Sequence, residues 1–502
     1  MTDPRPTRPA GLASGELGRR TIASGLAAVL ARIVHSGLLL GASMVLARLL
    51  TPADFGVFAM AVPLGALGTA FANHSFQTVI LQRPDTRPAD VDSLFWFAAQ
   101  VNLLVAGIMV AVGWGLAQWY GEPRLVPVVA GWAIAIYFLT LTGFQEALLK
   151  RALRFPAVLL VQLVGVAVSV VASIWAAVHG AGHWALLIQI LVMEGCRAVG
   201  IHWLGGWRPR RPVDADPTAV ASMRRSWRAL NGLRMATWIN DQPDLVAVAR
   251  MGDATVLGLY DTARRWTRYP FEEPFFSVTE VAVASLSQLR GDHDRFRRFV
   301  TRGFRAILTI TLPVVALVGA EAPSVVRVLL GPQWGSAAPF ARLLAVAAFA
   351  AAVARVTEWI ALAQGRSERL LRWSLIVRAP ILVAAVLLGS RHGALGVALA
   401  LAVVEVALAG ITIIYNVRHS GLAVGEVFQA IARPLIASLL AVAALTWLGG
   451  ALPGEPGGAR LALALLIHSA VYVTAWVGLP GGIAAARETI AALRERGPAV
   501  VK

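Results

Sequence analysis

Nine arginines lie inside segments of the sequence that are otherwise apolar enough to cross a membrane. An arginine at the centre of a bilayer costs roughly 2.5–3.5 kcal/mol on insertion scales, so each must face water, an acidic partner or a ligand. The planar guanidinium group binds two phosphate oxygens at once, which the ammonium group of lysine cannot do. A surplus of arginine over acid therefore predicts a phosphate or diphosphate ligand. The candidate binding residues are Arg32, Arg234, Arg264, Arg265, Arg268, Arg355 and Arg378.

The alternative is that some of the nine arginines form ion pairs that hold helices together. Arg197 follows Glu194 by three residues, so a structural pair is expected there. Arg342 lies near one end of its segment and can extend to the membrane surface. For the other seven this alternative stays open residue by residue, but the acids on the same helix faces are too few to neutralise the whole set.

The densest group of arginines follows helical spacing. Asp261, Arg264, Arg265 and Arg268 are related as i, i+3, i+4 and i+7, which places them on one face of a helix. This face would lie close to the middle of the membrane. Such a cluster favours an anionic ligand over an organic cation, which would need an acidic cavity instead.

The preceding segment combines arginine with aromatic and acidic side chains. Arg234, Trp238 and Asp241 fall on one helix face, and Asp244 follows about one turn later. A carboxylate among arginines can exchange partners when it binds a cation. The candidates to carry a coupling H⁺ or Na⁺ are therefore Asp241, Asp244 and Glu358.

Composition places the chain in a membrane. Of its 502 residues, 57% are hydrophobic and 15% charged, with a mean hydropathy of +0.66, whereas soluble domains are roughly 45–50% apolar and about 25% charged. Apolar stretches of about 18–25 residues recur, each long enough to cross ~30 Å of hydrocarbon as a helix. The lone Cys196 excludes disulfides within the chain. We predict an all-α polytopic membrane protein, and no signal peptide is expected before its first span.

The spans are expected to form two six-helix lobes followed by a helix pair. About fourteen are predicted, at 21–46, 55–73, 94–118, 125–145, 157–178, 184–204, 229–249, 256–286, 306–320, 341–362, 373–388, 395–417, 430–448 and 461–479. The stretch after Ala322 is a possible half-helix that leaves the count open between 12 and 14. The predicted parts are an N-terminal tail (1–20), an N-lobe (21–205), a linker (206–226), a C-lobe (227–418), the helix pair (419–482) and a C-terminal tail (483–502).

Charge placement agrees with this topology. With the N-terminus inside, 30 Lys and Arg residues fall in or beside cytoplasmic segments and 6 in external loops, as the positive-inside rule requires. The net charge of +17 is then explained by a cytoplasmic face beside anionic lipid. No basic domain stands free of the membrane, so nucleic acid is not an expected partner. Both termini are predicted to be cytoplasmic, and the expected location is the bacterial inner membrane.

One stretch of the sequence occurs twice. “ARLLTPADFGVFAMA” from Ala47 aligns without gaps with “ARMGDATVLGLYDTA” from Ala249, at an offset of 202 residues. A weaker match aligns “GAGHWAL” at Gly180 with “GALGVAL” at Gly393, although small residues also recur by chance. Six spans per lobe is an even number, so the lobes enter the membrane in the same orientation. Parallel repeats about an axis along the membrane normal are a transporter architecture.

Several segments resemble one known family in order. “LARLLTPADFGVFA” resembles the turn after the first span of bacterial polysaccharide-transport flippases, which belong to the multidrug/oligosaccharidyl-lipid/polysaccharide (MOP) exporter superfamily. The resemblance continues through “DLVAVARMGDATVLGLYDTARRWTRYP”, “VASLSQLRGDHDRFRRF”, “TLPVVALVGAEAPSVVRVLLGPQWGSAAPFARLLA” and “AQGRSERLLRWSLI”. It covers residues 18–418, and Asp244 matches the family's acidic position in the seventh span. One segment departs from the family: in “DTARRWTRYPFEEP” the three arginines, Glu272 and Glu273 are peculiar to this chain.

The resemblance implies both a fold and a function. It implies a V-shaped bundle that flips undecaprenyl-diphosphate-linked oligosaccharide across the inner membrane by alternating access, for exopolysaccharide, capsule or O-antigen biosynthesis. Trp238 and Tyr269 would then contact the glycan. The expected partners are the lipid-linked oligosaccharide, membrane lipid, a polysaccharide polymerase and a chain-length regulator, with the transporter itself a monomer. No cofactor is expected besides a coupling H⁺ or Na⁺.

Three other functions remain as alternatives. A lipid-II-type flippase and a drug or organic-cation antiporter belong to the same superfamily. A polytopic glycosyltransferase or polymerase would need a carboxylate pair or basic residues on a sizeable external loop. The predicted external loops are short and carry no convincing pair, and the nine His and one Cys show no metal-ligand spacing. Catalysis and a metal site are therefore not expected.

Overall fold

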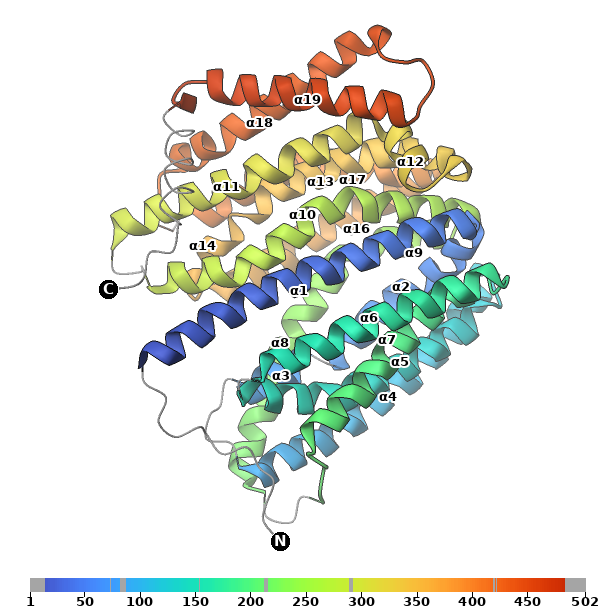
Figure 1. The fold of residues 1–502 in the computed structure, drawn as a ribbon, viewed down its shortest axis with the longest axis vertical. Coiled ribbons are helices and arrows are strands. Elements are labelled where there is room, and N and C mark those ends of the chain that lie inside the picture. The colour runs from blue at the N-terminus through green and yellow to red at the C-terminus, as the bar shows by residue number, and fades with distance from the viewer. Residues whose placement is uncertain are drawn as a thin grey trace. The chain divides into compact units, whose positions relative to one another are not determined.

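The fold is helical throughout the part of the chain that the structure describes. A computed structural model describes residues 14–483 apart from 73, 82–86, 153, 212–214, 289–291, 419 and 421, and Figure 1 shows its course. The predicted tails at 1–20 and 483–502 lie for the most part outside the described residues. The chain forms two compact units, 1–261 and 262–502. The predicted all-α class is confirmed.

The first unit contains the helices up to the start of α10. They are α1 (Ser14–Leu49), α2 (Pro52–Ala72), α3 (His74–Leu81), α4 (Pro88–Tyr120), α5 (Leu125–Arg151), α6 (Phe155–Val178), α7 (Trp184–Gly205), α8 (Pro217–Asp241), α9 (Pro243–Ala249) and α10 (Ala254–Gln288). Within this unit α5 and α7 pack on each other, and α6 lies between α1 and α7.

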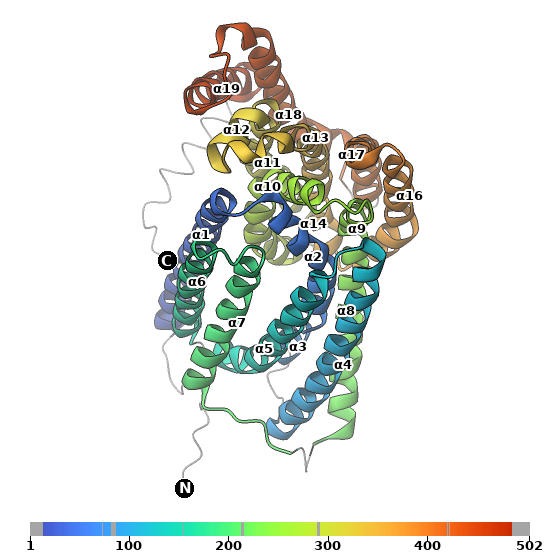
Figure 2. The same cartoon turned by 90° about the vertical axis from the view of Figure 1, so that its right-hand side faces the viewer.

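The second unit begins within α10. Its further helices are α11 (His293–Ala320), α12 (Ala322–Leu329), α13 (Ala338–Arg355), α14 (Glu358–Ala363), α15 (Ser367–Arg372), α16 (Ala379–Ser390), α17 (Gly393–Val417), α18 (Val424–Trp447) and α19 (Gly458–Gly478). A π-helical turn, Trp373–Arg378, joins α15 to α16. The helix pair α18–α19 packs on α11, as both views of the ribbon show (Figure 2).

Twelve segments among the described residues are long and apolar enough to cross a membrane. They match every predicted span except the seventh and eighth. The segments predicted as those two spans are α8 with α9, and α10, which fall short of the apolarity required because they carry the clustered charges. The count of fourteen spans therefore stays a prediction. The short helix expected after Ala322 is present as α12.

Two of the predicted spans are interrupted helices. α8 ends at Asp241 and α9 begins at Pro243, because proline has no N–H to continue the helix and its ring crowds the preceding turn. α13 ends at Arg355 and α14 begins at Glu358, one short irregular step later. Interrupted helices at membrane depth are tolerated where the freed backbone groups face protein or water, and in transporters they often flank binding sites. Both breaks carry charged residues singled out by the sequence.

The compact units divide inside α10 and not at the predicted linker, 206–226. The reason is that α8 packs on α2, α3 and α4. Trp227 of α8 stacks on Phe76 with ring centroids 5.3 Å apart, and Phe76 in turn lies 5.5 Å from Phe144. The described part of the linker is also held to this unit, since the backbone N–H of Asp216 donates to Asp90 at 2.8 Å. Residues 212–214 of the linker lie outside the described residues.

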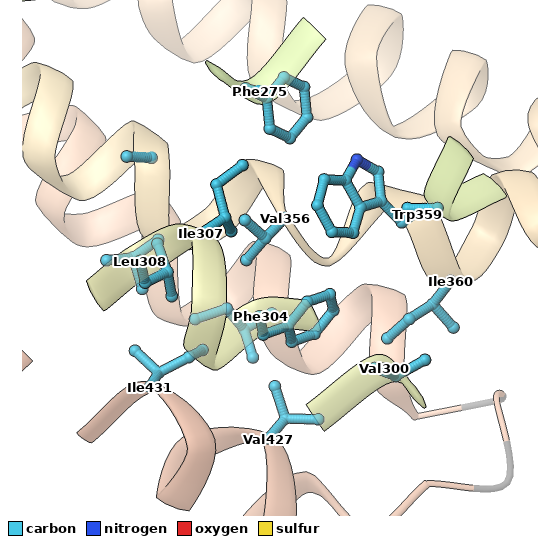
Figure 3. Close-up of a cluster of buried hydrophobic side chains, with 14 of the residues drawn as sticks. Phe275, Val300, Phe304, Ile307, Leu308, Val356, Trp359, Ile360, Val427 and Ile431 are labelled. Carbon is cyan, nitrogen blue, oxygen red and sulfur yellow. The ribbon is translucent and has the colours of Figure 1, made fainter. Parts of the chain in front are cut away.

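A buried aliphatic and aromatic cluster organises the second unit (Figure 3). It is built by α11, α13, α14, α17, α18 and the described part of α10. Trp359 at its edge stacks on Phe275 at 5.5 Å, and its indole N–H donates to the Thr279 hydroxyl at 2.9 Å. Because the tryptophan has its one polar atom satisfied, it can be buried to 1% exposure at this interface. The cluster fixes α14 against α10 just beyond the break at Arg355.

The two copies of the repeated stretch pack directly on each other. A Cβ at Gly56 would collide with the backbone carbonyl of Ala254, and a Cβ at Gly258 would collide with that of Pro52. Residues 52 and 254, like 56 and 258, are separated by the 202-residue offset of the repeat. The contact is therefore reciprocal, as a local two-fold axis requires. The weaker match also has a structural counterpart, because Gly180 and Gly393 both have positive φ, +78° and +75°.

Adding a methyl group at this crossing should destabilise the folded protein. Gly56→Ala and Gly258→Ala each force a side chain against backbone that cannot move aside, and overpacking of this kind costs typically ~1–3 kcal/mol or more. We expect a lower thermal unfolding midpoint and a smaller yield of monodisperse protein for both variants. Gly107→Ala on α4 is the matched control, because no atom lies within 4 Å of the added Cβ. Midpoints equal to that of the control would contradict the tight crossing.

Candidate functional site

Two predicted site residues of the first unit take part in contacts between helices. The indole N–H of Trp238 on α8 donates to the backbone carbonyl of Pro63 on α2 at 2.7 Å. Asp244 on α9 is buried to 5% exposure and accepts a hydrogen bond from the Tyr260 hydroxyl at 3.0 Å. Asp244 is thus held on one side of the break between α8 and α9. Trp238 contributes to the docking of α8, a role that the sequence did not indicate.

The remaining candidates of the first unit differ in exposure. Arg32 is exposed on α1, whereas Arg234 on α8 is partly buried. Asp241 is the last residue of α8 and is partly buried beside the break. The side-chain amide N–H of the neighbouring Asn240 donates to the carbonyl of Ala236 at 2.7 Å. Polar groups therefore gather where the helix is interrupted.

In the second unit two arginines meet at one carboxylate that the sequence did not rank as a site. Glu272 accepts from Arg268 at 2.9 Å on the same helix, and Arg355 of α13 lies 3.7 Å from the same oxygen. The i, i+4 spacing of Arg268 and Glu272 was the available signal. The pair across helices depends on how α13 packs, which sequence spacing does not reveal. The side chain of Glu273, also noted in the sequence, lies outside the described residues.

The other arginines of α10 occupy different environments. Arg264 is buried to 8% exposure, whereas the adjacent Arg265 is exposed. Tyr269 and Glu358 are both partly buried. Next to Glu358, the Thr357 hydroxyl donates to the carbonyl of Ala354, and Asn416 of α17 donates to that hydroxyl at 2.9 Å. The first bond satisfies the Ala354 carbonyl at the break between α13 and α14, and the second ties the break to α17.

Arg378 forms an ion pair. It lies at the end of the π-helical turn, and its guanidinium donates to Glu405 of α17 at 2.6 Å. Both side chains are largely buried, at 18% and 12% exposure. A carboxylate in this position neutralises the arginine and ties α16 to α17, so the structural alternative is favoured for this residue.

The pair expected at Arg197 is present and larger than the sequence suggested. Arg197 contacts Glu194 on its own helix and Glu146 on α5, both at 2.9 Å. Glu146 also binds Lys150 at 2.7 Å and accepts from Gln162 of α6 at 3.1 Å. Two acids and two bases thus neutralise one another among α5, α6 and α7. The network accounts for Arg197 without a ligand.

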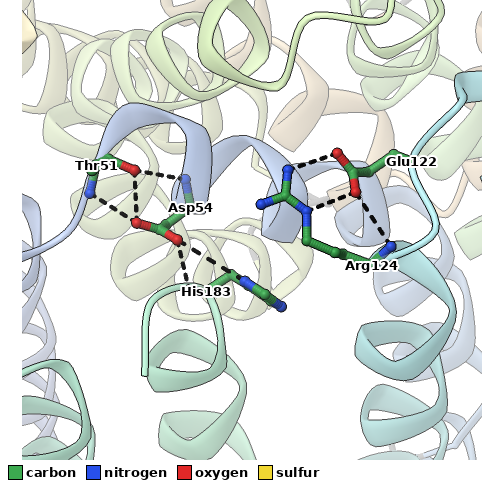
Figure 4. A network of polar contacts seen from close by, with 5 residues as sticks. All are labelled: Thr51, Asp54, Glu122, Arg124 and His183. Atoms are coloured by element: carbon green, nitrogen blue, oxygen red, sulfur yellow. Dashed lines mark hydrogen bonds and ion pairs between the residues drawn. The ribbon is translucent and has the colours of Figure 1, made fainter. Parts of the chain in front are cut away.

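A second polar network connects loops at one end of the first unit (Figure 4). Thr51 and Asp54 form a reciprocal cap of α2: the Thr51 hydroxyl donates to Asp54 at 2.7 Å, and the Asp54 N–H donates to Thr51. Asp54 also accepts from the backbone N–H of His183 in the loop between α6 and α7, at 3.1 Å. Nearby, Arg124 donates to Glu122 at 2.7 Å. The repeated stretch is therefore anchored to the loop before α7.

The charges of this network shift the pKa values of Glu122 and His183. The hydrogen bond from Arg124 holds the pKa of Glu122 below its usual value. Burial lowers the pKa of His183, and the positive charge of Arg124 lowers it further, although Asp54 opposes both effects. The neutral form of His183 is thus favoured in the folded protein.

Acidification should loosen this end of the protein. Because the pKa of His183 is lowered on folding, the unfolded chain binds the proton more readily below about pH 6.5, the unperturbed value. Stability is fully present above that pH and falls as the pH drops below it. We expect the thermal unfolding midpoint to decrease when the pH is lowered from about 7.5 to about 5.5. In His183→Gln this decrease should be smaller. His179→Gln is the control, since His179 lies in the same loop and contacts Trp175 through its carbonyl and its ring. An undiminished fall in His183→Gln would contradict the assignment.

Comparison with known proteins identifies the family. The sequence model of a family described as polysaccharide biosynthesis proteins matches residues 45–339, which is more than half of the chain. The chain belongs to this family. The match contains both copies of the repeated stretch, the break in the seventh predicted span and the arginines of α10. Among the described residues, no group of three His, Cys, Asp or Glu side chains is arranged to hold a metal ion.

Curated relatives match over most of their length. The succinoglycan biosynthesis transport protein ExoT of Rhizobium meliloti is 23% identical over 70% of this chain and 70% of its own. The lipopolysaccharide biosynthesis protein WzxC of Escherichia coli is 20% identical over 78% of this chain and 79% of its own. The amylovoran biosynthesis protein AmsL of Erwinia amylovora is 20% identical over 61% of this chain and 79% of its own.

Solved structures establish the fold. The lipid II flippase MurJ in an inward closed conformation superposes with a TM-score of 0.67 over 91% of this chain and 98% of its own, at 12% identity. An inward-facing multidrug transporter of the MOP superfamily gives a TM-score of 0.58 over 79% of this chain and 96% of its own, at 13% identity. The chain therefore has the fold of these two transporters.

Proposed function

We propose that this chain is a flippase for polyprenyl-diphosphate-linked oligosaccharides in the biosynthesis of a bacterial polysaccharide. Family membership supports this role, and so do relatives named for the transport or biosynthesis of succinoglycan, lipopolysaccharide and amylovoran. The protein would act in the inner membrane with both termini in the cytoplasm. The expected cargo is undecaprenyl-diphosphate-linked, and its polyprenyl chain would stay in the lipid while the headgroup crosses.

The observation that carries the proposal is the group of arginines at Glu272. Arg268 and Arg355 come from different helices and share one carboxylate. Arg264 lies one turn before Arg268 on α10, and its exposure is only 8%. An ion pair of this kind has the geometry to exchange its carboxylate for the oxygens of a diphosphate, because guanidinium binds both with the same fork. A cationic drug would meet repulsion from these groups. Arg378, which pairs with Glu405, lies outside this group.

We regard the chain as a transporter and not an enzyme. The family relatives named above are transport or biosynthesis proteins, and the polar groups described at the loop end of the first unit cap helices or form close pairs. A lipid-II-type flippase would share the fold, but the similarity to MurJ concerns the fold alone. The family match and the curated relatives favour polysaccharide carriers. A polymerase and a chain-length regulator are the expected partners in the cell.

Neutralising the arginines of α10 should block export. Arg264→Gln and Arg268→Gln each remove charged hydrogen bonds to the diphosphate, and such bonds contribute ~1.5–3 kcal/mol each, or about tenfold or more in affinity. In cells that depend on this chain for polysaccharide export, we expect surface polysaccharide to fall and the lipid-linked precursor to accumulate in the inner leaflet. Immunoblots would confirm equal amounts of protein in the membrane.

The control for this experiment is Arg391→Gln, which removes an exposed arginine from the turn between α16 and α17. Arg264→Lys tests the fork, since it keeps the charge and should restore export only in part. Export at the wild-type level in both glutamine variants would sink the diphosphate assignment. Loss of export without precursor accumulation would place the defect before transport.

We further propose that Asp244 couples transport to a cation, with H⁺ or Na⁺ as the ion. Its burial beside a helix break and its bond from Tyr260 support this, because binding a proton or a sodium ion there would alter the interaction that holds α9 to α10. Asp244→Asn retains the shape and removes the charge. In vesicles loaded with lipid-linked sugar, transport by this variant should no longer respond to an imposed H⁺ or Na⁺ gradient.

The matched control is Asp294→Asn, at a carboxylate that is 76% exposed on α11. It should transport with the same response as the wild type. A response to the gradient that persists in Asp244→Asn assigns coupling elsewhere, with Asp241 and Glu358 the next candidates.

A further inference from the structure

Hydrogen-bond donors without acceptors gather at one end of the three-helix group α11, α18 and α19. The guanidinium carbon of Arg433 on α18 lies 5.5 Å from the ring centroid of Trp476 on α19. Nη2 of Arg433 donates to the backbone carbonyl of Pro480, in the turn that follows α19. Among the described residues, Nη1 of Arg433 and the indole N–H of Trp476 are both buried without a hydrogen-bond partner. Two unsatisfied donors thus lie at one place.

A second arginine lies at the same level. The Tyr472 hydroxyl of α19 donates to the carbonyl of Thr309 on α11 at 2.8 Å, and Leu317 packs with Ala464, so these two helices run antiparallel. Arg305 lies about one turn (~5.4 Å along the axis) before Thr309 on α11, and Trp476 lies about one turn after Tyr472 on α19. Because the helices are antiparallel, Arg305 and Trp476 lie at the same level. Arg305 is near enough for its charge to interact with that of Arg433. Like charges on neighbouring helices repel each other, and an anion between them removes that repulsion.

The one acid of α18 lies two turns before Arg433 and pairs through one of its oxygens with another arginine. Glu426, in the first turn of α18, binds Arg297 of α11 at 3.0 Å. An unmet buried donor costs about 1–3 kcal/mol, so the arrangement calls for an acceptor. The oxygens of a phosphate group can accept several hydrogen bonds, and its negative charge neutralises the guanidinium groups. The three donor side chains Arg305, Arg433 and Trp476 match it in charge and in hydrogen bonding.

We infer that Arg305, Arg433 and Trp476 form a binding site for the phosphate group of an anionic membrane phospholipid. The site lies toward the basic end of α11, which the charge distribution predicts to be cytoplasmic, where anionic lipid attracts Lys and Arg. Exposed apolar side chains continue from it along the same helices, among them Ile310, Leu440 and Val473. Acyl chains packed there would continue from a phosphate held by the arginines. The lipid would act as a ligand that fastens α18 and α19 to α11, apart from the transported cargo.

The site can be tested by counting bound lipid. Full-length protein is extracted in mild detergent and examined by native mass spectrometry with phosphatidylglycerol and, separately, zwitterionic phosphatidylethanolamine. We expect one phosphatidylglycerol to remain bound after delipidation, and Arg433→Gln to weaken it by about tenfold, or ~1.4 kcal/mol. Arg433→Lys should retain part of the affinity. Arg391→Gln, at the other end of the unit, is the matched control and should bind like the wild type.

Two further arms separate the sources and guard against misfolding. Thermal unfolding midpoints of delipidated wild-type protein are measured with phosphatidylglycerol and, separately, with inorganic phosphate. This measurement does not depend on the folding of any variant. A rise with the lipid alone supports the proposal, whereas a rise with inorganic phosphate alone assigns a soluble anion and overturns the lipid. Equal retention of both lipids, or equal loss in Arg433→Gln and Arg391→Gln, also overturns it. Because the readout is lipid binding, the outcome is independent of whether the cargo proposed above is correct.

Discussion

The close approach of the first turns of α2 and α10 is the constraint on which the described first unit depends. Gly56 and Gly258 each lie against a carbonyl of the other copy of the repeat, at positions where any Cβ would collide. Helices in a bilayer gain no hydrophobic advantage from meeting each other, so their association relies on close packing of small residues. The crossing brings α2 against the start of α10. It thereby sets where the charged face of α10 begins.

Charged residues in this protein are accommodated in two distinct ways. At Arg197 and Arg378 each guanidinium has dedicated carboxylates, which lock neighbouring helices together. At Glu272 one carboxylate is shared by arginines of two helices, and Arg264 is buried about two turns earlier in the same helix as Glu272. Buried pairs with matched partners stabilise a fold but are difficult to reuse. A shared carboxylate can give way to a ligand, which is why we place the diphosphate there.

Much of the fold followed from local sequence. Long apolar stretches require helices in a membrane, because every backbone polar group must then be satisfied within its own segment. The Glu194–Arg197 spacing indicated a pair on one helix face, whereas the break at Pro243 interrupts a span that was predicted to be continuous, 229–249. Contacts between helices did not follow. Glu146, Glu272 and Glu405 each meet an arginine of another helix, and no spacing within one segment reveals such a neighbour.

The sequence by itself determined the helical class, the repeat, the charge asymmetry and the residue types that could hold a diphosphate. Each of these depends on periodicity or composition, which are local properties of the chain. Tertiary structure alone decided that Arg197 and Arg378 pair with acids of other helices, that Trp238 docks α8 on α2, and that donors of α18 and α19 lack acceptors among the described residues. The physical reason is that ion pairs and hydrogen bonds act over a few ångströms. Residues separated by a hundred positions or more come within that range only when the helices pack.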